Sequence, residues 1–411
     1  MIDEEANCLF IFFNSINENG IILNMKLSVN THLSREDIIK NGSIFTPDYI
    51  VQLVINQLKG RLTNDSVIVD FGAGYGAFCS AFLKLPHQKI IATDCDEQSI
   101  AFVKQEHQGI ETILENSLKD INRLKYCDND SDLVVVGNPP YNDVTSQYKK
   151  GQKGSFEMDD DVLARDLGIS FLKMYDKINA KYICVLHPLS YLCKKNNFNS
   201  LGEFNNHYKL VSGVLFSSKH FESIKKTNAE FPVVAALYER SKEGMAFDYI
   251  LNFKFDVYGT DKKYILSSFN TIDGVVGKYP TKDKKDTDLQ FYTLRDINAL
   301  KRNTTFLVGH CNNGIKMSKD KLYYYAWLDL FKNYFDAGEY QYLFGNLSPL
   351  LTNRINNPDF QDQLVAFILN ENDIVRDYYK MNDRDFFDKF VSIKYSKEEL
   401  INECRLLSQF W

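Results

Sequence analysis

Short, nearly continuous apolar runs recur along the first 240 residues, with amphipathic segments between them. The runs predict strands at 66–70, 89–94, 133–136, 182–186 and 231–238. The intervening segments space their apolar residues as a helix does, and they predict helices at 47–58, 77–85, 96–105 and 164–178. Runs of Val and Ile of this kind are typical of mostly parallel strands that are buried on both faces. We therefore expect an α/β fold built on a mixed, mostly parallel sheet with helices on both faces.

The pattern changes after about residue 240. Hydrophobic runs become shorter there, polar and aromatic residues mix, and the sequence beyond residue 360 reads as helical again. We expect an N-terminal extension at 1–40, the α/β domain at 41–240, and an α+β domain at 241–411 whose C-terminal part is helical.

The composition is that of an ordinary folded protein, with 411 residues of which 44% are hydrophobic and 25% are charged. The eight cysteines are scattered without a CxxC pair, so we expect free thiols, a reducing compartment and no structural metal. The start, Asp3-Glu4-Glu5, is acidic where a signal peptide is basic, and the apolar run 9–13 is too short to span a bilayer. These features indicate a cytoplasmic protein with no membrane partner.

A glycine-rich turn follows the first predicted strand of the α/β domain. The strand ends at Asp70 and leads into Phe71-Gly72-Ala73-Gly74-Tyr75-Gly76, ahead of a predicted helix. Glycines allow such a tight turn and the close approach of a ligand to the backbone, and the free N–H groups of a helix start attract an anionic group. The spacing is GxGxG, whereas a dinucleotide site usually has GxGxxG. A turn without a ligand and an NAD site remain alternatives at this point.

An acidic residue, Asp94, ends the next predicted strand. A carboxylate there can accept hydrogen bonds from both ribose hydroxyls of an adenosine. Sites for NAD and for S-adenosylmethionine share this feature, so Asp94 does not separate the two cofactors.

The sequence Asn138-Pro139-Pro140-Tyr141 follows the strand at 133–136, and it distinguishes a site for S-adenosylmethionine from a site for NAD. The prolines have no N–H, so carbonyl oxygens remain free to accept hydrogen bonds, and the Asn138 side-chain oxygen is a second acceptor. Two acceptors on one planar amine favour a pyramidal nitrogen with a localised lone pair, which can attack a sulfonium methyl group in line. The ring of Tyr141 offers a face on which a planar base can stack.

With these motifs the chain resembles the gamma group of amino-methyltransferases, the N6-adenine DNA enzymes of the class I, S-adenosylmethionine-dependent fold. The resemblance spans roughly residues 44–240. It implies a Rossmann-like catalytic domain followed by a C-terminal target-recognition domain, with S-adenosyl-L-methionine as cofactor and no metal. The whole of Asn138-Pro139-Pro140-Tyr141 matches the family's catalytic motif.

The resemblance also implies the residues that bind the cofactor. The segment Phe45-Thr46-Pro47 is similar to the part of the family that helps to hold the methionine portion. Asn116 stands where the family usually has an Asp near the cofactor adenine, which is a departure from the pattern. The implied cofactor-binding set is Thr46, Asp70, Gly72, Gly74, Asp94 and Asn116.

A methyl donor buried in a pocket cannot reach an amine inside a stacked duplex, so the resemblance implies base flipping. Phe221 lies where the family often has an aromatic residue on the other side of the flipped base from Tyr141. The implied partner is double-stranded DNA, with a monomeric enzyme that acts alone or beside a cognate restriction endonuclease.

Charge gives little support for a DNA partner over the whole chain, whose net charge is −6. Residues 241–333 contain 15 Lys and Arg against 11 Asp and Glu, a local net of +4, although an ordinary solvated face has the same appearance. The candidate DNA contacts are Lys149, Lys150 and Lys153 in the loop 142–161, Arg295, Lys301 and Arg302, and the stretch 316–321 beside Tyr323, Tyr324 and Tyr325.

Three alternatives stay open from the sequence. Methyltransferases of release-factor glutamine or of RNA guanine carry similar Asn-Pro-Pro-Tyr motifs, but more than a third of this chain follows the α/β domain, which favours a large substrate such as DNA. Cytosine-N4 enzymes more often begin the motif with Ser. A DNA-binding subunit without activity would have no reason to retain the whole motif. The lone histidine His187 is expected to be a packed structural residue rather than a catalyst.

Overall fold

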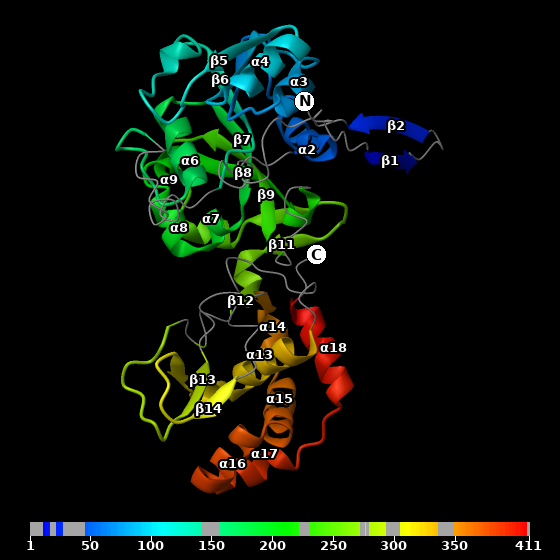
Figure 1. Ribbon diagram of the computed structural model, residues 1–411, viewed down its shortest axis with the longest axis vertical. Coiled ribbons are helices and arrows are strands. Elements are labelled where there is room, and N and C mark those ends of the chain that lie inside the picture. The colour runs from blue at the N-terminus through cyan, green and yellow to red at the C-terminus, as the bar shows by residue number, and fades with distance from the viewer. Residues whose placement is uncertain are drawn as a thin grey trace, which may run out of the picture. The chain divides into compact units, whose positions relative to one another are not determined.

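The computed structural model of this chain describes residues 11–16, 22–27, 46–141, 157–221, 230–271, 276, 279–292, 305–335 and 349–408. The chain divides into two units, residues 1–43 and residues 44–411. The first unit contains the antiparallel pair β1 (Ile11–Ile16) and β2 (Ile22–Leu27) (Figure 1). Part of the apolar run at 9–13 therefore lies in β1.

The second unit is built on a mixed sheet (Figure 1), and within the described residues this sheet has nine strands. The order across it is β11-β10-β8-β9-β7-β6-β3-β4-β5. Strands β3 to β7 are parallel to one another, and β9 runs antiparallel between β7 and β8. The bounds are β3 (Ser66–Phe71), β4 (Lys89–Asp94), β5 (Ile110–Leu114), β6 (Asp132–Gly137), β7 (Tyr182–Pro188), β8 (Tyr208–Ser217), β9 (Pro232–Arg240), β10 (Lys254–Val257) and β11 (Lys263–Ile265).

Helices cover both faces of this sheet, and the alternation of side chains along β3 shows the division. Val67 and Val69 belong to the apolar cluster that includes α6, whereas Ile68 belongs to the cluster that includes α2, α3 and α4. The helices of this part are α2 (Asp48–Leu58), α3 (Ala77–Phe82), α4 (Glu97–Glu106), α6 (Leu167–Lys177), α7 (Ser190–Cys193), α8 (Lys195–Ser200), α9 (Phe204–His207) and α10 (Phe247–Leu251). The expected fold class is confirmed.

All five strands that the apolar runs predicted are present, but β5 and β8 were not predicted. Strand β5 is half exposed, so its sequence lacks a continuous apolar run. Strand β8 is interrupted by polar residues and by Gly213, and its register with β9 shifts between Leu210 and Ser212. A Cβ atom at Gly213 would lie 2.8 Å from the ring of Phe255 on β10, so the missing side chain lets that ring pack against β8.

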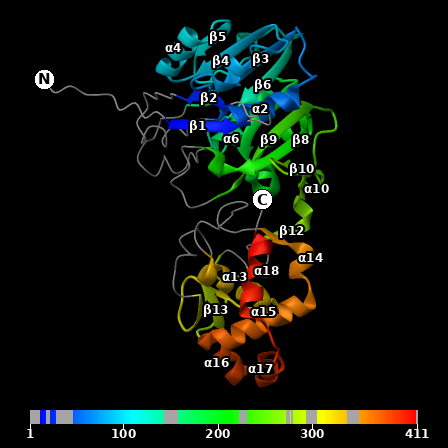
Figure 2. The ribbon, with the colours of Figure 1, turned by 90° about the vertical axis from the view of Figure 1, so that its right-hand side faces the viewer.

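The C-terminal part has its own apolar core around α13 (Leu322–Tyr334), where Trp327 and Phe331 stack at 5.2 Å. Helices α13 and α15 to α18 pack in one group (Figure 2), which confirms the helical tail expected beyond residue 360. The other elements are β12 (Phe269–Thr271), β13 (Leu289–Tyr292), β14 (Phe306–Val308), β15 (Gly314–Lys316), β16 (Pro349–Leu351), α14 (Thr352–Ile355), α15 (Pro358–Glu371), α16 (Asp373–Asn382), α17 (Arg384–Val391) and α18 (Lys397–Ser408).

The large sheet continues through β10 and β11, beyond the boundary expected near residue 240. The division of the chain into domains stays a prediction. Across the parts of the chain that the structure describes, no helix is both long and apolar enough to cross a membrane.

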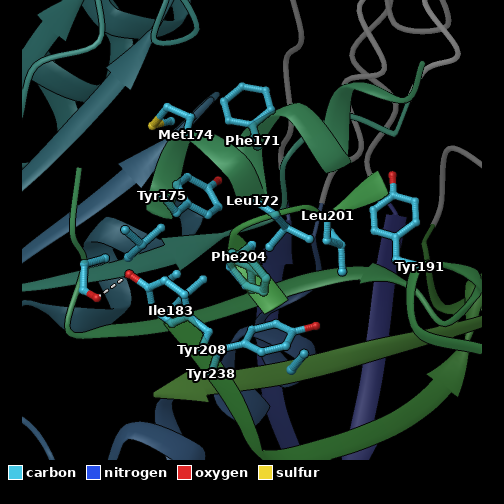
Figure 3. Packing of buried hydrophobic residues seen from close by; sticks show 14 of the residues in the cluster. Phe171, Leu172, Met174, Tyr175, Ile183, Tyr191, Leu201, Phe204, Tyr208 and Tyr238 are labelled. Atoms are coloured by element: carbon cyan, nitrogen blue, oxygen red, sulfur yellow. Dashed lines mark hydrogen bonds between the residues drawn. The ribbon is translucent and has the colours of Figure 1, made fainter. Parts of the chain in front are cut away.

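An aromatic core underlies the sheet on the α6 side, and Figure 3 shows its rings. Tyr208 is fully buried in it, where its hydroxyl donates to the carbonyl oxygen of Ala180 at 2.6 Å (Figure 3) and lies 3.2 Å from a guanidinium nitrogen of Arg240. These bonds satisfy a buried polar atom that would otherwise carry a desolvation cost.

We expect Tyr208→Phe to lower the free energy of unfolding by about 1–2 kcal/mol, because the carbonyl of Ala180 would lose its partner in the core. Urea unfolding of the full chain measures this change. Tyr279→Phe is the matched control, since Tyr279 is 70% exposed and should change little. Equal stability of Tyr208→Phe and the wild type would contradict this account of the core.

Candidate functional site

Three short segments meet at one edge of the sheet. Strand β3 pairs with β4 on one side and with β6 on the other, and all three run in the same direction. The glycine-rich turn after β3, Asp94 at the end of β4 and Asn138 after β6 therefore lie side by side, at the edge where open α/β sheets bind ligands. A Cβ atom on Gly72 would lie 3.9 Å from Cδ of Pro140, so the glycine turn and the Asn-Pro-Pro-Tyr segment are in contact distance.

Backbone N–H groups hold the glycine turn against β4. The N–H groups of Gly72 and Ala73 both donate to the carbonyl oxygen of Thr93 at 2.9 Å. Gly72 and Gly74 have φ angles of +74° and +51°, in the left-handed region that favours glycine. This backbone conformation explains why the sequence has glycine at both positions.

Both carboxylate oxygens of Asp94 accept backbone hydrogen bonds. Gly74 N–H donates to Oδ2 at 2.8 Å, and Asp96 N–H donates to Oδ1 at 2.9 Å. Burial raises the pKa of Asp94, and the hydrogen bonds from Asp96 and Gly74 oppose that rise. Each carboxylate oxygen has more than one lone pair, so a further donor such as a ribose hydroxyl is chemically compatible with these bonds.

Asp70, at the end of β3, is only 1% exposed, and its Oδ1 has no hydrogen-bond partner. Gly137 faces it from β6 with φ +142°, and a Cβ atom there would lie 2.4 Å from Oδ1. Burial and, to a lesser extent, the charge of Asp94 raise the pKa of Asp70 well above its usual range. A buried acceptor without a partner beside a glycine turn fits a cationic donor supplied by a ligand.

The amide of Asn138 is held in one orientation. Its Nδ2 donates to Oγ1 of Thr46 at 3.0 Å, and Thr46 itself is 4% exposed. The hydroxyl of Tyr141 donates to Oδ1 of Asn138. With the amine side of the amide bound to Thr46, Oδ1 is the side that accepts from a donor.

A second group of polar residues, which the sequence did not single out, lies behind Tyr141. Asp166 precedes α6 and accepts hydrogen bonds from Gly168 N–H at 3.0 Å and from the Tyr191 hydroxyl. Burial and the negative charge of Asp166 raise the pKa of Tyr141 well above its usual range, so its hydroxyl stays protonated. Asp166 lies within the helix predicted at 164–178 and is the N-cap of α6 in the structure, so local sequence shows only an ordinary helix-capping residue and not this contact.

His187 is fully buried and packs as expected. Its ring stacks on Tyr191 at 5.2 Å and on Tyr238 at 6.0 Å, and its Nε2 lies 2.7 Å from the Tyr238 hydroxyl. Burial lowers the pKa of His187 to about 4, so the ring is neutral at physiological pH.

Asn116 and Phe221 both have partners within the protein at the positions where the resemblance implies ligand contacts. Asn116 follows β5 at the same edge, where its Nδ2 donates to the carbonyl oxygen of Glu157 at 2.6 Å and its Oδ1 accepts from Leu118 N–H at 3.1 Å. Phe221 is fully buried in the cluster on the α2 side, against Phe216 at 5.7 Å. Because the ring is fully buried, a base could stack on Phe221 only if the ring left this packing.

The candidate DNA contacts fall into two groups. Six of the candidate cations lie outside the described residues: Lys149, Lys150, Lys153, Arg295, Lys301 and Arg302. Phe45, in the segment that the resemblance relates to the cofactor, also lies outside them. In the stretch that is described, Lys316 pairs with Asp288 at 3.3 Å and Lys319 pairs with Asp383 at 2.6 Å. The neighbouring rings of Tyr324 and Tyr325 are buried in the C-terminal core. The described residues contain no group of three or more His, Cys, Asp or Glu side chains that could hold a metal ion.

The raised pKa of Asp70 predicts how the free energy of unfolding depends on pH. Its folded-state pKa is raised, so its favourable contribution is present below about pH 4, the unfolded value, and is lost as pH rises through the folded value. Asp70→Asn should therefore be more stable than the wild type at pH 7, by about 1 kcal/mol or more, with the difference disappearing near pH 4. Denaturant unfolding across pH 4–8 measures it, with the exposed Asp65→Asn as control. A difference independent of pH would contradict the assignment.

One protein-family model matches part of this chain. Residues 42–158 match the family described as Methyltransferase small domain. No curated protein sequence matches. Among solved structures, a putative RNA methyltransferase from Pyrococcus horikoshii is 12% identical, with 49% of this chain and 88% of that chain covered and a TM-score of 0.33.

Two further solved structures are similar at the same level. A dimethyladenosine transferase from Plasmodium falciparum is 14% identical over 48% of this chain and 64% of that one, with a TM-score of 0.32. A putative class I S-adenosylmethionine-dependent methyltransferase from Listeria monocytogenes is 14% identical over 51% and 69%, with a TM-score of 0.35. The family match and the mixed sheet with its glycine turn show that the α/β part of this chain has the Rossmann-like methyltransferase fold, which implies S-adenosylmethionine as the cofactor.

Proposed function

We propose that this protein is an adenine-specific DNA methyltransferase, which transfers a methyl group from S-adenosylmethionine to the exocyclic N6 of a flipped adenine in a specific double-stranded DNA sequence. The observation that carries the proposal is the fixed orientation of the Asn138 side-chain amide. Thr46 fixes its amide so that Oδ1 accepts, and this happens at the end of β6, next to the glycine turn.

The exocyclic amine of adenine is a poor nucleophile because its lone pair is delocalised into the ring. Oδ1 of Asn138 and the carbonyl oxygen of Pro139 each accept one hydrogen of the amine, which favours a pyramidal nitrogen. S-adenosylmethionine supplies an electrophilic methyl group on a sulfonium. The nitrogen forms a bond to that methyl carbon as the carbon–sulfur bond breaks and its electron pair goes to sulfur, and the amine then loses one proton to solvent.

Tyr141 has two parts in this proposal. In the structure its hydroxyl occupies the Oδ1 acceptor of Asn138, the position that the substrate amine takes when the base enters. Its ring then offers a face for stacking of the flipped base, with Phe221 on the other side after that ring has left its packing against Phe216.

The cofactor residues belong to the same proposal. Gly72 and Gly74 let the methionine portion approach the backbone, Asp94 accepts from the ribose, and the unpartnered Oδ1 of Asp70 receives a cationic group. Asn116 contacts the adenine edge of the cofactor once it releases Glu157, and Thr46 also borders the methionine portion.

The C-terminal part, residues 241–411, is proposed to recognise the DNA target. Its segment 241–333 has a net charge of +4, against −6 for the whole chain, so cations are concentrated there. The proposal includes a monomer in the cytoplasm of a prokaryote or phage host, acting alone or with a cognate restriction endonuclease.

Asn138→Ala should lower methyl transfer to DNA by at least about 100-fold, because it removes an acceptor that acts on the reacting amine. Affinity for S-adenosylmethionine, measured by calorimetry, should change less than about threefold. Transfer is followed with labelled cofactor and unmethylated genomic DNA, and the product is identified by nucleoside mass spectrometry. Asn129→Ala, at an exposed position, is the matched control.

The product identifies the substrate class. N6-methyladenine that depends on Asn138 supports the proposal, whereas label in RNA or in a protein glutamine would move the function to another amine substrate. Wild-type activity in Asn138→Ala would sink the mechanism. Cofactor binding by the wild type without transfer to any substrate would favour a subunit that does not catalyse.

Thr46 gives a separate test, because a bond to Asn138 and a contact with the cofactor have different kinetic signatures. Thr46→Val keeps the shape and removes the hydroxyl, and we expect kcat to fall about five- to tenfold, the equivalent of one hydrogen bond of about 1 kcal/mol. Thr46→Ser should restore most of the rate. If Thr46→Val instead weakens cofactor binding at unchanged kcat, Thr46 is a cofactor contact and not a positioning residue for Asn138.

A further inference from the structure

Three aromatic rings from distant parts of the sequence meet near the start of α2. Tyr49 stacks on Tyr258 at 6.1 Å with an interplanar angle of 17°, and His220 meets both rings edge-on at 5.6 Å. Nδ1 of His220 lies 3.1 Å from the Tyr49 hydroxyl. We call Tyr49, His220 and Tyr258 the aromatic shelf.

The direction of the strands places the shelf at the same edge of the sheet as Asn138. Strand β9 is antiparallel to both β7 and β8, so β8 runs in the direction of β7 and β6, and β10 is parallel to β8. His220 follows the carboxyl end of β8 through the 3-10 turn η2 (Ser218–His220), and Tyr258 directly follows β10. Strand β8 is the third strand from β6, about 14 Å away along the edge at ordinary strand spacing.

A second connection runs through α2. Thr46, which bonds to Asn138 at 3.0 Å, lies three residues before Tyr49, with Pro47 in an extended conformation between them. Three residues span at most about 11 Å, so the partner of the Asn138 amide lies within that distance of the shelf along the chain. The shelf therefore borders the candidate site on the side away from Asp94 and the glycine turn.

The chemistry of the shelf suits a planar, uncharged group. Tyr49 remains 45% exposed although its ring already stacks on Tyr258, so it presents a broad aromatic surface to solvent. Burial lowers the pKa of His220, which keeps that ring neutral at physiological pH. The nearest cation in the sequence, Lys219, forms an ion pair with Glu230 at 2.5 Å. Aromatic stacking, rather than attraction of phosphate, is what these groups offer.

We propose that the aromatic shelf is a second base-binding surface, on which an unstacked base of the DNA strand stacks close to the flipped adenine. This proposal rests on the proposed function. Flipping one base out of a duplex disturbs the stacking of its neighbours, and a rigid aromatic surface at the same edge replaces part of that lost stacking. Because every base has an aromatic face, the shelf contributes affinity with little sequence preference, unlike a residue that reads a base edge.

Tyr49→Ala and Tyr258→Ala should each raise the KM for DNA about fivefold or more, since stacking on one aromatic ring contributes about 1–3 kcal/mol per base. The cofactor Kd and the kcat at saturating DNA should stay within about twofold of the wild type. Tyr49→Phe keeps the ring and should behave as the wild type. Leu124→Ala, which removes an exposed apolar side chain elsewhere on the same domain, is the matched control. Unchanged thermal midpoints establish that the variants are folded.

An abasic scan identifies the base itself. Once sequencing has given the methylated site, duplexes that lack one base at a time on either side of the target adenine are compared. Removal of the stacked base should raise the KM of the wild type and have no further effect in Tyr49→Ala, as expected when two changes remove one interaction.

The outcomes separate this proposal from the one on which it rests. Methyl transfer to DNA with an unchanged KM in both alanine variants would overturn the shelf and leave the proposed function standing. No transfer to DNA by the wild type would remove both. A KM effect confined to an RNA substrate would overturn the choice of DNA.

Discussion

The parallel arrangement of β4, β3 and β6 forces three short segments to meet, because each strand ends at the same edge of the sheet. The glycine turn, Asp94 and Asn138 come from positions far apart in the sequence, and this edge brings them together. Strands β7, β8 and β10 run in the same direction, so the aromatic shelf lies at the same edge of the sheet as the glycine turn and Asn138. The antiparallel β9 is what allows β8 to return parallel to β7 and extend the edge beyond the Asn-Pro-Pro-Tyr segment.

Close backbone approach at this edge has a cost in stability. Gly137 comes so near to Asp70 that no side chain fits, and the buried carboxyl is left with an oxygen that has no partner. A buried acceptor without a partner destabilises a fold by about 1–3 kcal/mol, so an arrangement of this kind is expected where a ligand completes it. Asn138 differs from Asp70, since both ends of its amide are already satisfied, by Thr46 and by Tyr141. Entry of the substrate amine exchanges one hydrogen-bond donor for another at Oδ1 and releases the Tyr141 hydroxyl from that acceptor.

Local sequence patterns predicted the central strands of the sheet and the glycine turn. Strands β3, β4, β6, β7 and β9 are buried on both faces, so each carries a continuous apolar run, and glycines mark the turn because its backbone has positive φ. Strand β5 was not predicted because it is half exposed, and β8 because polar residues and Gly213 interrupt it. The hydrogen bond between Thr46 and Asn138 joins residues 92 positions apart, and no local pattern encodes such a pairing. The shelf was missed for the same reason. The proposed role of Phe221 came from its place in the motif order, which carries no information about its burial in the core.

The central claim is that Asn138 directs methyl transfer to an exocyclic amine of adenine in DNA. The most direct measurement uses a duplex whose adenines carry ¹⁵N at N6 together with cofactor bearing a deuterated methyl group. The account predicts a methylated adenosine that retains the ¹⁵N and carries the deuterated methyl on that same nitrogen, formed by the wild type and lost in Asn138→Ala. A methyl group on a ring nitrogen of adenine or on the N4 of cytosine would contradict it.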